Sequence, residues 1–185
     1  MKAFDAWTAF LIPTEGKLSL NPKDPGNWTS GKPGVGQLVG TKYGVAASSH
    51  PGLDIPNLTL AQAQQIAKAE YWDKVNGDKM PGGVAFLVAD AAWGSGPYVA
   101  ATELQAIVGV TQDGDIGMVE TIPAIVRYGA RKSLYTMRSG MDDLLTEYCS
   151  QRLIFENGLA IWADNKLGWT RRLFRSLDIA LTLVD

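Results

Sequence analysis

Hydrophobic residues recur at helical spacing in several stretches of the chain, and segments rich in glycine and proline separate these stretches. Phe4, Trp7 and Leu11 form the apolar side of the first stretch, which Gly16 should end. The sequence Thr59-x-x-Gln62 has the form of a capping box and begins another helix. The pattern predicts helices over residues 2–14, 60–76, 84–92, 131–157 and 169–184.

Residues 17–47 follow a different pattern. Short β-prone pieces at 36–39 and 43–45 alternate with glycines and prolines, and they predict a two- or three-stranded hairpin. The sequence Gly94-Ser95-Gly96-Pro97 predicts a boundary between residues 1–94 and 95–185. We therefore expect an α+β protein, predominantly α-helical, whose two regions pack as one compact domain.

The composition restricts the class of function. The 185 residues are 46% apolar and 19% charged, as is typical of a globular protein, and the net charge of −2 argues against general nucleic-acid binding. No apolar stretch is long enough for a membrane span, and an amphipathic helix explains the first residues better than a signal peptide does. The single cysteine, Cys149, lies in an apolar helical row, which indicates a small core side chain.

Two acidic residues near the amino end are candidates for catalysis. Glu15 follows the apolar first helix, and Asp24 comes nine positions later within a turn sequence. The turns between them would let the chain double back and bring both carboxylates to one groove, an arrangement used to cleave glycosidic bonds. The alternative is that Glu15 is a solvated helix end and that Asp24 is only a turn residue.

Three short segments occur in a specific order around these acids. They are Glu15-Gly16, Asp24-Pro25-Gly26-Asn27-x-Thr29 and Lys42-Tyr43-Gly44-Val45-Ala46. In this order they resemble the glycan-cleaving motif of phage endolysins of glycoside hydrolase family 108, which reads roughly E-G-G-Y, D-P-G-G-x-T and G-I-T. The chain departs from that motif at Lys17, Leu18 and Asn27, and it carries an inserted loop at residues 30–40.

Later segments resemble other parts of the same endolysins. They are Tyr71-Trp72-Asp73, Phe86-x3-Asp90-Ala91-Ala92, Leu104-Gln105-x3-Gly109-Val110, Asp113-Gly114-x-Ile116-Gly117 with Thr121, and Gly168-Trp169-x-x-Arg172. The resemblance implies that residues 95–185 are a peptidoglycan-binding region. The segment at 113–117 lacks the glutamate that a calcium loop needs at its twelfth position, so we expect a connection between two helices rather than a metal site.

The resemblance implies a lysozyme-like fold with a small β-hairpin lobe, and a catalytic site at the amino end. Glu15 would act as the general acid, and Asp24 would orient water or stabilise the transition state. A threonine hydroxyl would position the water. Thr29 keeps the family distance to Asp24, whereas Thr41 keeps the distance to Gly44, and we expect Thr29.

Three aromatic residues are predicted to contact substrate, because aromatic faces pack on sugar rings. They are Tyr43, Tyr71 and Trp72. For Tyr71 and Trp72 the alternative is that they are core residues of a helix.

The resemblance further implies an N-acetylmuramidase, an endolysin that cleaves the β-1,4 bond of peptidoglycan and lyses bacteria. It would need no cofactor or metal, act as a monomer, be made in the host cytoplasm and reach the wall by holin-type release. The arginine-rich helix at 169–184 either contacts anionic envelope lipids or completes the core with solvated arginines.

Other functions stay open. A lytic transglycosylase would use one glutamate and give anhydro products, and a non-catalytic peptidoglycan-binding module would only bind. Zinc and Cys–His peptidases are disfavoured, because the chain has one histidine, His50, and one cysteine. Asp90 lies in an almost wholly apolar stretch, so we expect it to be hydrogen-bonded to neighbouring backbone rather than to face a cleft.

Overall fold

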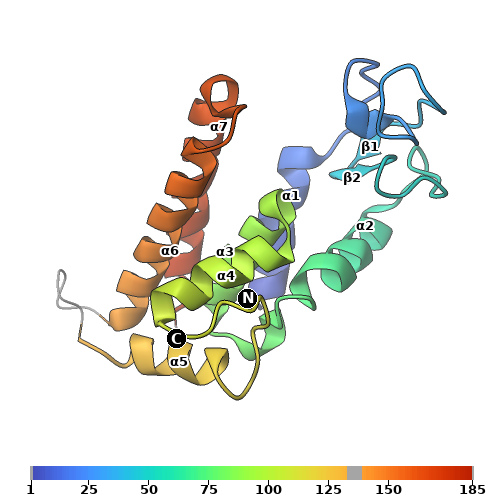
Figure 1. Ribbon diagram of the computed structural model, residues 1–185. Helices are drawn as coiled ribbons and strands as arrows, with labels where there is room; N and C mark the ends of the chain where they lie inside the picture. Colours follow the sequence, from blue (N-terminus) through green and yellow to red (C-terminus); the bar gives the residue numbers. More distant parts are fainter. Residues whose placement is uncertain (1, 133–138, 185) are drawn as a thin grey trace. The chain divides into compact units, whose positions relative to one another are not determined.

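The computed structural model describes residues 2–132 and 139–184, without the side chains of residues 13–15. Its helices are α1 (Ala3–Glu15), α2 (Leu60–Ala67), α3 (Gly82–Ser95), α4 (Pro97–Val108), α5 (Thr121–Gly129), α6 (Gly140–Asn157) and α7 (Trp162–Leu181) (Figure 1). Two strands, β1 (Thr41–Lys42) and β2 (Val45–Ala46), pair antiparallel. We call residues 8–68 the hairpin unit, and residues 1–7 together with 69–185 the helical unit, because the chain divides into these two compact units.

The predicted fold class is confirmed, since the chain is mostly helical with one small antiparallel sheet. α1 and α3 lie where the hydrophobic pattern places them. α2 is shorter than predicted, because the chain passes into a π-helical turn at Lys68–Trp72 and reverses at Asn76, which has a φ of 53°. The predicted division of function at residues 94–97 falls between α3 and α4 of the helical unit and stays a prediction.

The two carboxy-terminal helices also differ from their predicted bounds. α6 begins at Gly140, so Arg131 and Lys132 lie before it rather than in it, and residues 133–138 of the predicted helix lie outside the described residues. α7 begins at Trp162, seven residues before the predicted start. This first part of α7 carries an aromatic contact of 6.1 Å between the rings of Trp162 and Trp169.

The hairpin unit is built around one tight turn. Tyr43 and Gly44 have φ angles of 54° and 76°, and positive φ at both positions is what a type I′ turn requires between β1 and β2. Ser19 and Thr41 exchange two backbone hydrogen bonds, of 2.8 and 3.0 Å, which pair a third segment with β1. The unit has a small core of its own, formed by Val45, Ala47, Ile55, Leu58 and Ala63.

The helical unit is arranged around α3, which packs against α4, α6 and α7. Every residue from Gly83 to Ala92 is buried, as the apolar run predicts. Cys149 of α6 is 5% exposed, and burial raises the pKa of its thiol to about 12, so the interpretation as a core side chain holds. No helix among the described residues is long and apolar enough to cross a membrane.

Asp90 is the one acidic residue in the buried part of α3, and two arginines hold it. Arg152 of α6 approaches one of its oxygens to 2.6 Å, and Arg172 of α7 approaches the other to 2.8 Å. Burial alone would raise the pKa of Asp90, but the two guanidinium groups outweigh it and the pKa is lowered. The expected structural role therefore rests on two ion pairs between helices rather than on neighbouring backbone.

Candidate active site

The first candidate acid closes α1. The helix ends at Glu15, directly before Gly16, as predicted. The side chain of Glu15 lies outside the described residues, so its role as general acid stays a prediction. The chain leads from this position straight into the loop that carries Asp24.

Asp24 is exposed and caps a single turn of 3-10 helix at Pro25–Asn27. Its Oδ1 accepts a hydrogen bond of 2.9 Å from Gly26 N, and its backbone N–H donates to Asn21 O at 3.1 Å. These contacts fix the orientation of the carboxylate. No described residue donates to Oδ2, so this oxygen is open to water or to substrate.

The two candidate threonines have different surroundings. Thr29 Oγ1 accepts a hydrogen bond of 3.0 Å from Gln37 N, across the inserted loop. Thr41 Oγ1 lies near the turn at Gly26: a Cβ placed on Gly26 would stand 3.8 Å from it and 3.2 Å from Asp24 Oδ1. Asp24 Oδ1 and Thr41 Oγ1 therefore both border the turn at Gly26.

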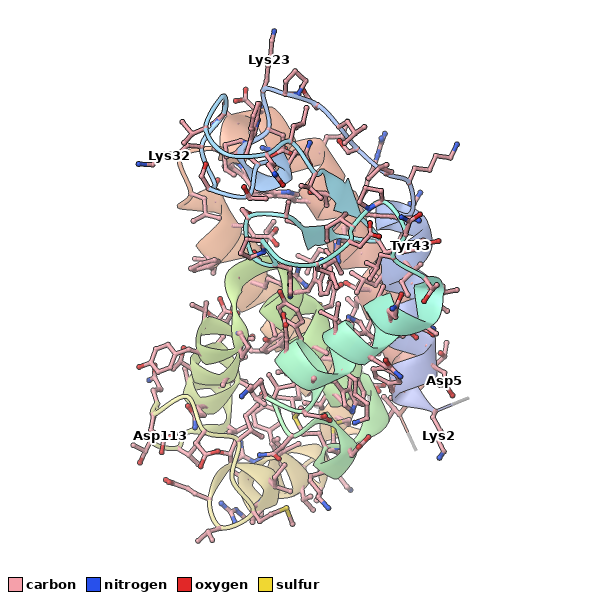
Figure 2. All side chains as sticks on the ribbon, turned by 90° about the vertical axis from the view of Figure 1, so that its right-hand side faces the viewer. Lys2, Asp5, Lys23, Lys32, Tyr43 and Asp113 are labelled. Carbon is pink, nitrogen blue, oxygen red and sulfur yellow. The ribbon has the colours of Figure 1, made fainter. Side chains whose placement is uncertain are left out.

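Tyr43 occupies an uncommon backbone conformation for a bulky residue, because its φ is positive. Its ring packs against the small core of the hairpin unit, and Lys42 Nζ lies 5.4 Å from the ring centroid. The same lysine donates to Pro56 O at 2.9 Å. By contrast, Figure 2 shows Lys23 and Lys32 extending outward from the loops of this unit.

Comparison with known proteins gives two matches that bear on this geometry. A solved structure of SagA from Brucella abortus is 30% identical, with a TM-score of 0.77, and the match covers 97% of this chain and 94% of that chain. The model of the family glycosyl hydrolase 108 matches residues 8–96. The chain belongs to glycosyl hydrolase family 108. No curated protein matches it.

Family 108 membership makes the chain a glycoside hydrolase, and the family indicates a peptidoglycan hydrolase of the muramidase type. The matched region includes the whole hairpin unit. Glu15, Asp24, both threonines and Tyr43 all belong to that unit. The family match therefore covers the residues that carry the proposed chemistry.

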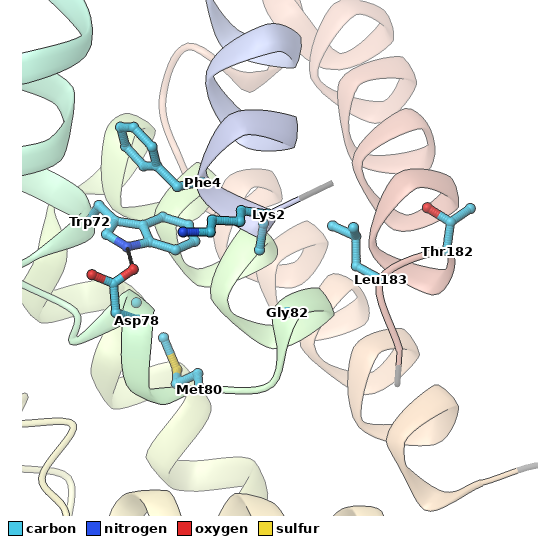
Figure 3. A pocket seen from close by; sticks show the side chains of 10 residues that line it. Lys2, Phe4, Trp72, Asp78, Met80, Gly82, Thr182 and Leu183 are labelled. Carbon is cyan, nitrogen blue, oxygen red and sulfur yellow. Dashed lines mark hydrogen bonds between the residues drawn. The ribbon is translucent and has the colours of Figure 1, made fainter.

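The other two predicted sugar contacts of this family 108 hydrolase lie in the helical unit. Trp72 is 2% exposed, and its ring stacks on that of Trp7 with 5.9 Å between the centroids. Its indole N–H donates to Asp78 Oδ1 at 2.9 Å (Figure 3). It lines a pocket of about 540 Å³ together with Phe4. Tyr71 is half-buried, and its ring lies 4.7 Å from that of Trp93. Their contact with sugar stays a prediction.

The motif residues of the predicted binding region contact one another. Gln105 Nε2 donates to Asp113 Oδ1 at 2.7 Å and to Asp115 O at 2.9 Å, and Gln105 Oε1 accepts from Gly114 N at 2.9 Å. Thr121 Oγ1 completes the set with a donation of 3.2 Å to Asp115 O. These bonds hold the connection between α4 and α5, and no group of metal-ligating side chains occurs among the residues that the structure describes.

Sequence reasoning missed one residue of the site. Asn27 entered only as a departure from the family motif, yet it is completely buried next to Asp24. Residues in a turn follow no hydrophobic period, so the sequence could not indicate that Asn27 is buried.

Proposed function

We propose that this hydrolase is an N-acetylmuramidase that cleaves the β-1,4 bond between N-acetylmuramic acid and N-acetylglucosamine. The observation that carries the proposal is the turn at Gly26, which Asp24 Oδ1 and Thr41 Oγ1 both border. A carboxylate with one open oxygen next to a hydroxyl can orient a water molecule against a sugar ring.

The proposed roles follow from this geometry. Glu15 donates its proton to the glycosidic oxygen as general acid. Asp24 orients the attacking water or stabilises the positive charge that develops on the sugar. The hydroxyl of Thr41 fixes the position of that water, a role for which Thr29 is the alternative. Tyr43 supports β1, and with it Thr41, through the tight turn.

Replacement of Glu15 by glutamine tests the assignment. Glutamine keeps the size of the side chain but has no acidic proton, so we expect reducing-sugar release from purified peptidoglycan to fall by ~10²–10⁴-fold. The matched control is Glu147→Gln, at an exposed glutamate of α6, which should retain wild-type activity. If Glu15→Gln released sugar at the wild-type rate, Glu15 would not be the acid.

Mass spectrometry of the released fragments identifies the bond and the reaction. A muramidase gives fragments that end in reducing N-acetylmuramic acid, whereas a lytic transglycosylase gives anhydro ends and a binding module gives no fragments. We expect reducing ends. We propose bacterial lysis as the outcome, so wild type but not Glu15→Gln should clear suspensions of bacteria whose outer membrane has been permeabilised.

Residues 95–185 are proposed to add affinity for the wall, and the motif resemblance is what supports this role. Tyr71 remains a proposed sugar contact because part of its ring is exposed. The burial of Trp72 leaves it little surface for a sugar.

A further inference from the structure

Asn27 is completely buried, although Asp24, three residues before it, is exposed. Its side-chain Nδ2 donates to Asn21 O at 3.0 Å and to Ser19 Oγ at 3.3 Å. Both acceptors belong to the loop between Glu15 and Asp24. The amide of Asn27 therefore ties that loop down from inside the unit.

The backbone of Asn27 makes further connections. Its carbonyl oxygen accepts from Val39 N and from Gly40 N, each at 3.0 Å, and its N–H donates to Asp24 O at 3.2 Å. Gly40 directly precedes Thr41, the proposed water-positioning residue. One residue thus joins the segment that carries Asp24 to the segment that carries Thr41.

Trp28 reinforces the same loop from the next position. Its indole Nε1 donates to Pro22 O at 2.9 Å. With the bond from Asp24 N to Asn21 O, the segment from Asn21 to Asp24 is held at both ends and in the middle. The turn that presents the Asp24 carboxylate is therefore held by the side chains of Asn27 and Trp28 as well as by its own hydrogen bonds.

Within the part of the chain that the structure describes, the side chain of Asn27 bonds through its Nδ2 and not through its Oδ1. Asn27 Oδ1 is buried and has no hydrogen-bond partner among the described residues. An unpartnered buried acceptor is destabilising, so the two bonds that Nδ2 donates are made at the expense of Oδ1. The amide cannot be turned over to avoid this, because Asn21 O accepts only and requires a donor.

We propose that Asn27, together with Trp28, is a positioning residue of the hydrolase: the two side chains fix the loop from Ser19 to Asp24, which pairs with Thr41 through Ser19, and so set where the Asp24 carboxylate stands for the attacking water. The inference rests on the proposed function. Asn27 itself does not touch substrate, because it is 0% exposed. Its effect on the reaction passes through Asp24.

A double-mutant cycle on kcat tests this dependence, because residues that act through one another give non-additive effects. The variants are Asn27→Ala, Asp24→Asn and the double variant, assayed on purified peptidoglycan. We expect Asn27→Ala to lower kcat by on the order of 10²-fold with little change in KM, since a small misplacement of a reacting group has this effect. In the Asp24→Asn background, Asn27→Ala should lower kcat no further.

Trp28→Phe keeps an aromatic side chain and removes the donor to Pro22 O, so it gives a second route to the same cycle if Asn27→Ala does not fold. We expect it to lower kcat about tenfold in wild type and not in Asp24→Asn. Asn57→Ala is the control, because Asn57 is an exposed asparagine of the hairpin unit that bonds Asp54 at 2.9 Å, and it should keep the wild-type kcat.

The outcomes separate the inference from the proposed function. The positioning role is overturned, and the muramidase mechanism stays intact, if Asp24→Asn loses activity and Asn27→Ala or Trp28→Phe lowers kcat by a further, independent factor in that background. Wild-type activity in Asp24→Asn overturns both. If Asn27→Ala or Trp28→Phe folds and keeps the wild-type kcat, the positioning role is also overturned.

Discussion

Two threonine hydroxyls of the hairpin unit differ in what they contact. Thr29 Oγ1 accepts from Gln37 N and so holds the inserted loop to the segment before it. Thr41 Oγ1 lies beside the turn at Gly26 that also orients Asp24. A hydroxyl that positions water has to lie next to the carboxylate, so these contacts favour Thr41 for the reaction and Thr29 for loop structure.

Valine replacements distinguish the two hydroxyls, because valine keeps the branched shape of threonine and removes only the oxygen. We expect Thr41→Val to lower kcat by on the order of 10²-fold. Thr29→Val should lower the free energy of unfolding by about 1 kcal/mol, through the lost bond to Gln37, with kcat within a few-fold of wild type. Steady-state kinetics and urea unfolding measure both quantities. A large loss of kcat in Thr29→Val alone would assign the water to Thr29.

From the sequence we expect Thr29, but spacing alone does not separate the two threonines. The inserted loop preserves one family distance for each, to Asp24 for Thr29 and to Gly44 for Thr41. What separates them is a hydrogen bond across the loop and the approach of residue 41 to Gly26, and both depend on segments that are distant along the chain. Spacing therefore leaves both hydroxyls as candidates for positioning the water.

At the scale of elements, the sequence pattern predicted the helices and caps that residues close together in the chain determine. The amphipathic residues of α1, the apolar run of α3 and the capping box at Thr59 all lie where the sequence indicated. The predicted bounds failed where a distant contact decides them. The predicted helix over 60–76 ends instead at Ala67, and the chain later reverses at Asn76, whose Nδ2 donates to Ile116 O at 2.9 Å, forty residues away.

The pairing of the segment before Asp24 with β1 depends on one glycine. Gly40 has a φ of 100°, and a Cβ on it would lie 2.6 Å from Ser19 O, which is one of the two acceptors that pair Ser19 with Thr41. A side chain at position 40 would therefore clash with the backbone carbonyl of Ser19. The pairing of residues 19 and 41 should be lost first if residue 40 is not glycine.

Gly40→Ala tests this, and Gly34→Ala is its matched control. Gly34 also has a positive φ, 79°, but a Cβ there would meet no atom within 4 Å, so the control contains the backbone strain without the clash. Strain should cost about 1–2 kcal/mol in either variant, and the clash should add about 1–3 kcal/mol in Gly40→Ala. Hydrogen exchange at the amides of Ser19 and Thr41 measures the difference. Equal protection in the two variants would contradict the proposed clash.

At the scale of the whole molecule, charges buried between helices organise the helical unit. Asp90 of α3 pairs with Arg152 and Arg172, and Arg152 Nε also donates to Glu156 Oε1 at 3.1 Å. Two carboxylates and two guanidinium groups balance one another in this cluster. Glu103 of α4 faces the same cluster and would add a third carboxylate, although its Oε1 is buried and has no hydrogen-bond partner among the described residues.

The third carboxylate, Glu103, makes the stability of the helical unit depend on pH. Burial raises the pKa of Glu103 to about 7, with Arg152 opposing the shift and Glu156 adding to it. A carboxyl group whose pKa is higher in the folded protein than in the unfolded chain binds its proton more tightly when folded. The contribution of Glu103 to stability is therefore fully present below its unfolded pKa of about 4.5, and it is lost as the pH rises through about 7.

Glu103→Gln removes this dependence, because glutamine resembles the protonated acid at every pH. We expect the free energy of unfolding of the variant to match that of wild type near pH 5 and to exceed it at pH 8. Urea unfolding at pH 5, 6, 7 and 8 measures the difference, with Glu147→Gln as the control at an exposed glutamate. Glu156, whose pKa burial also raises, titrates in both proteins, and its repulsion of Glu103 is part of the difference between them. A difference that is the same at all four pH values would show that Glu103 acts through packing alone and not through its charge.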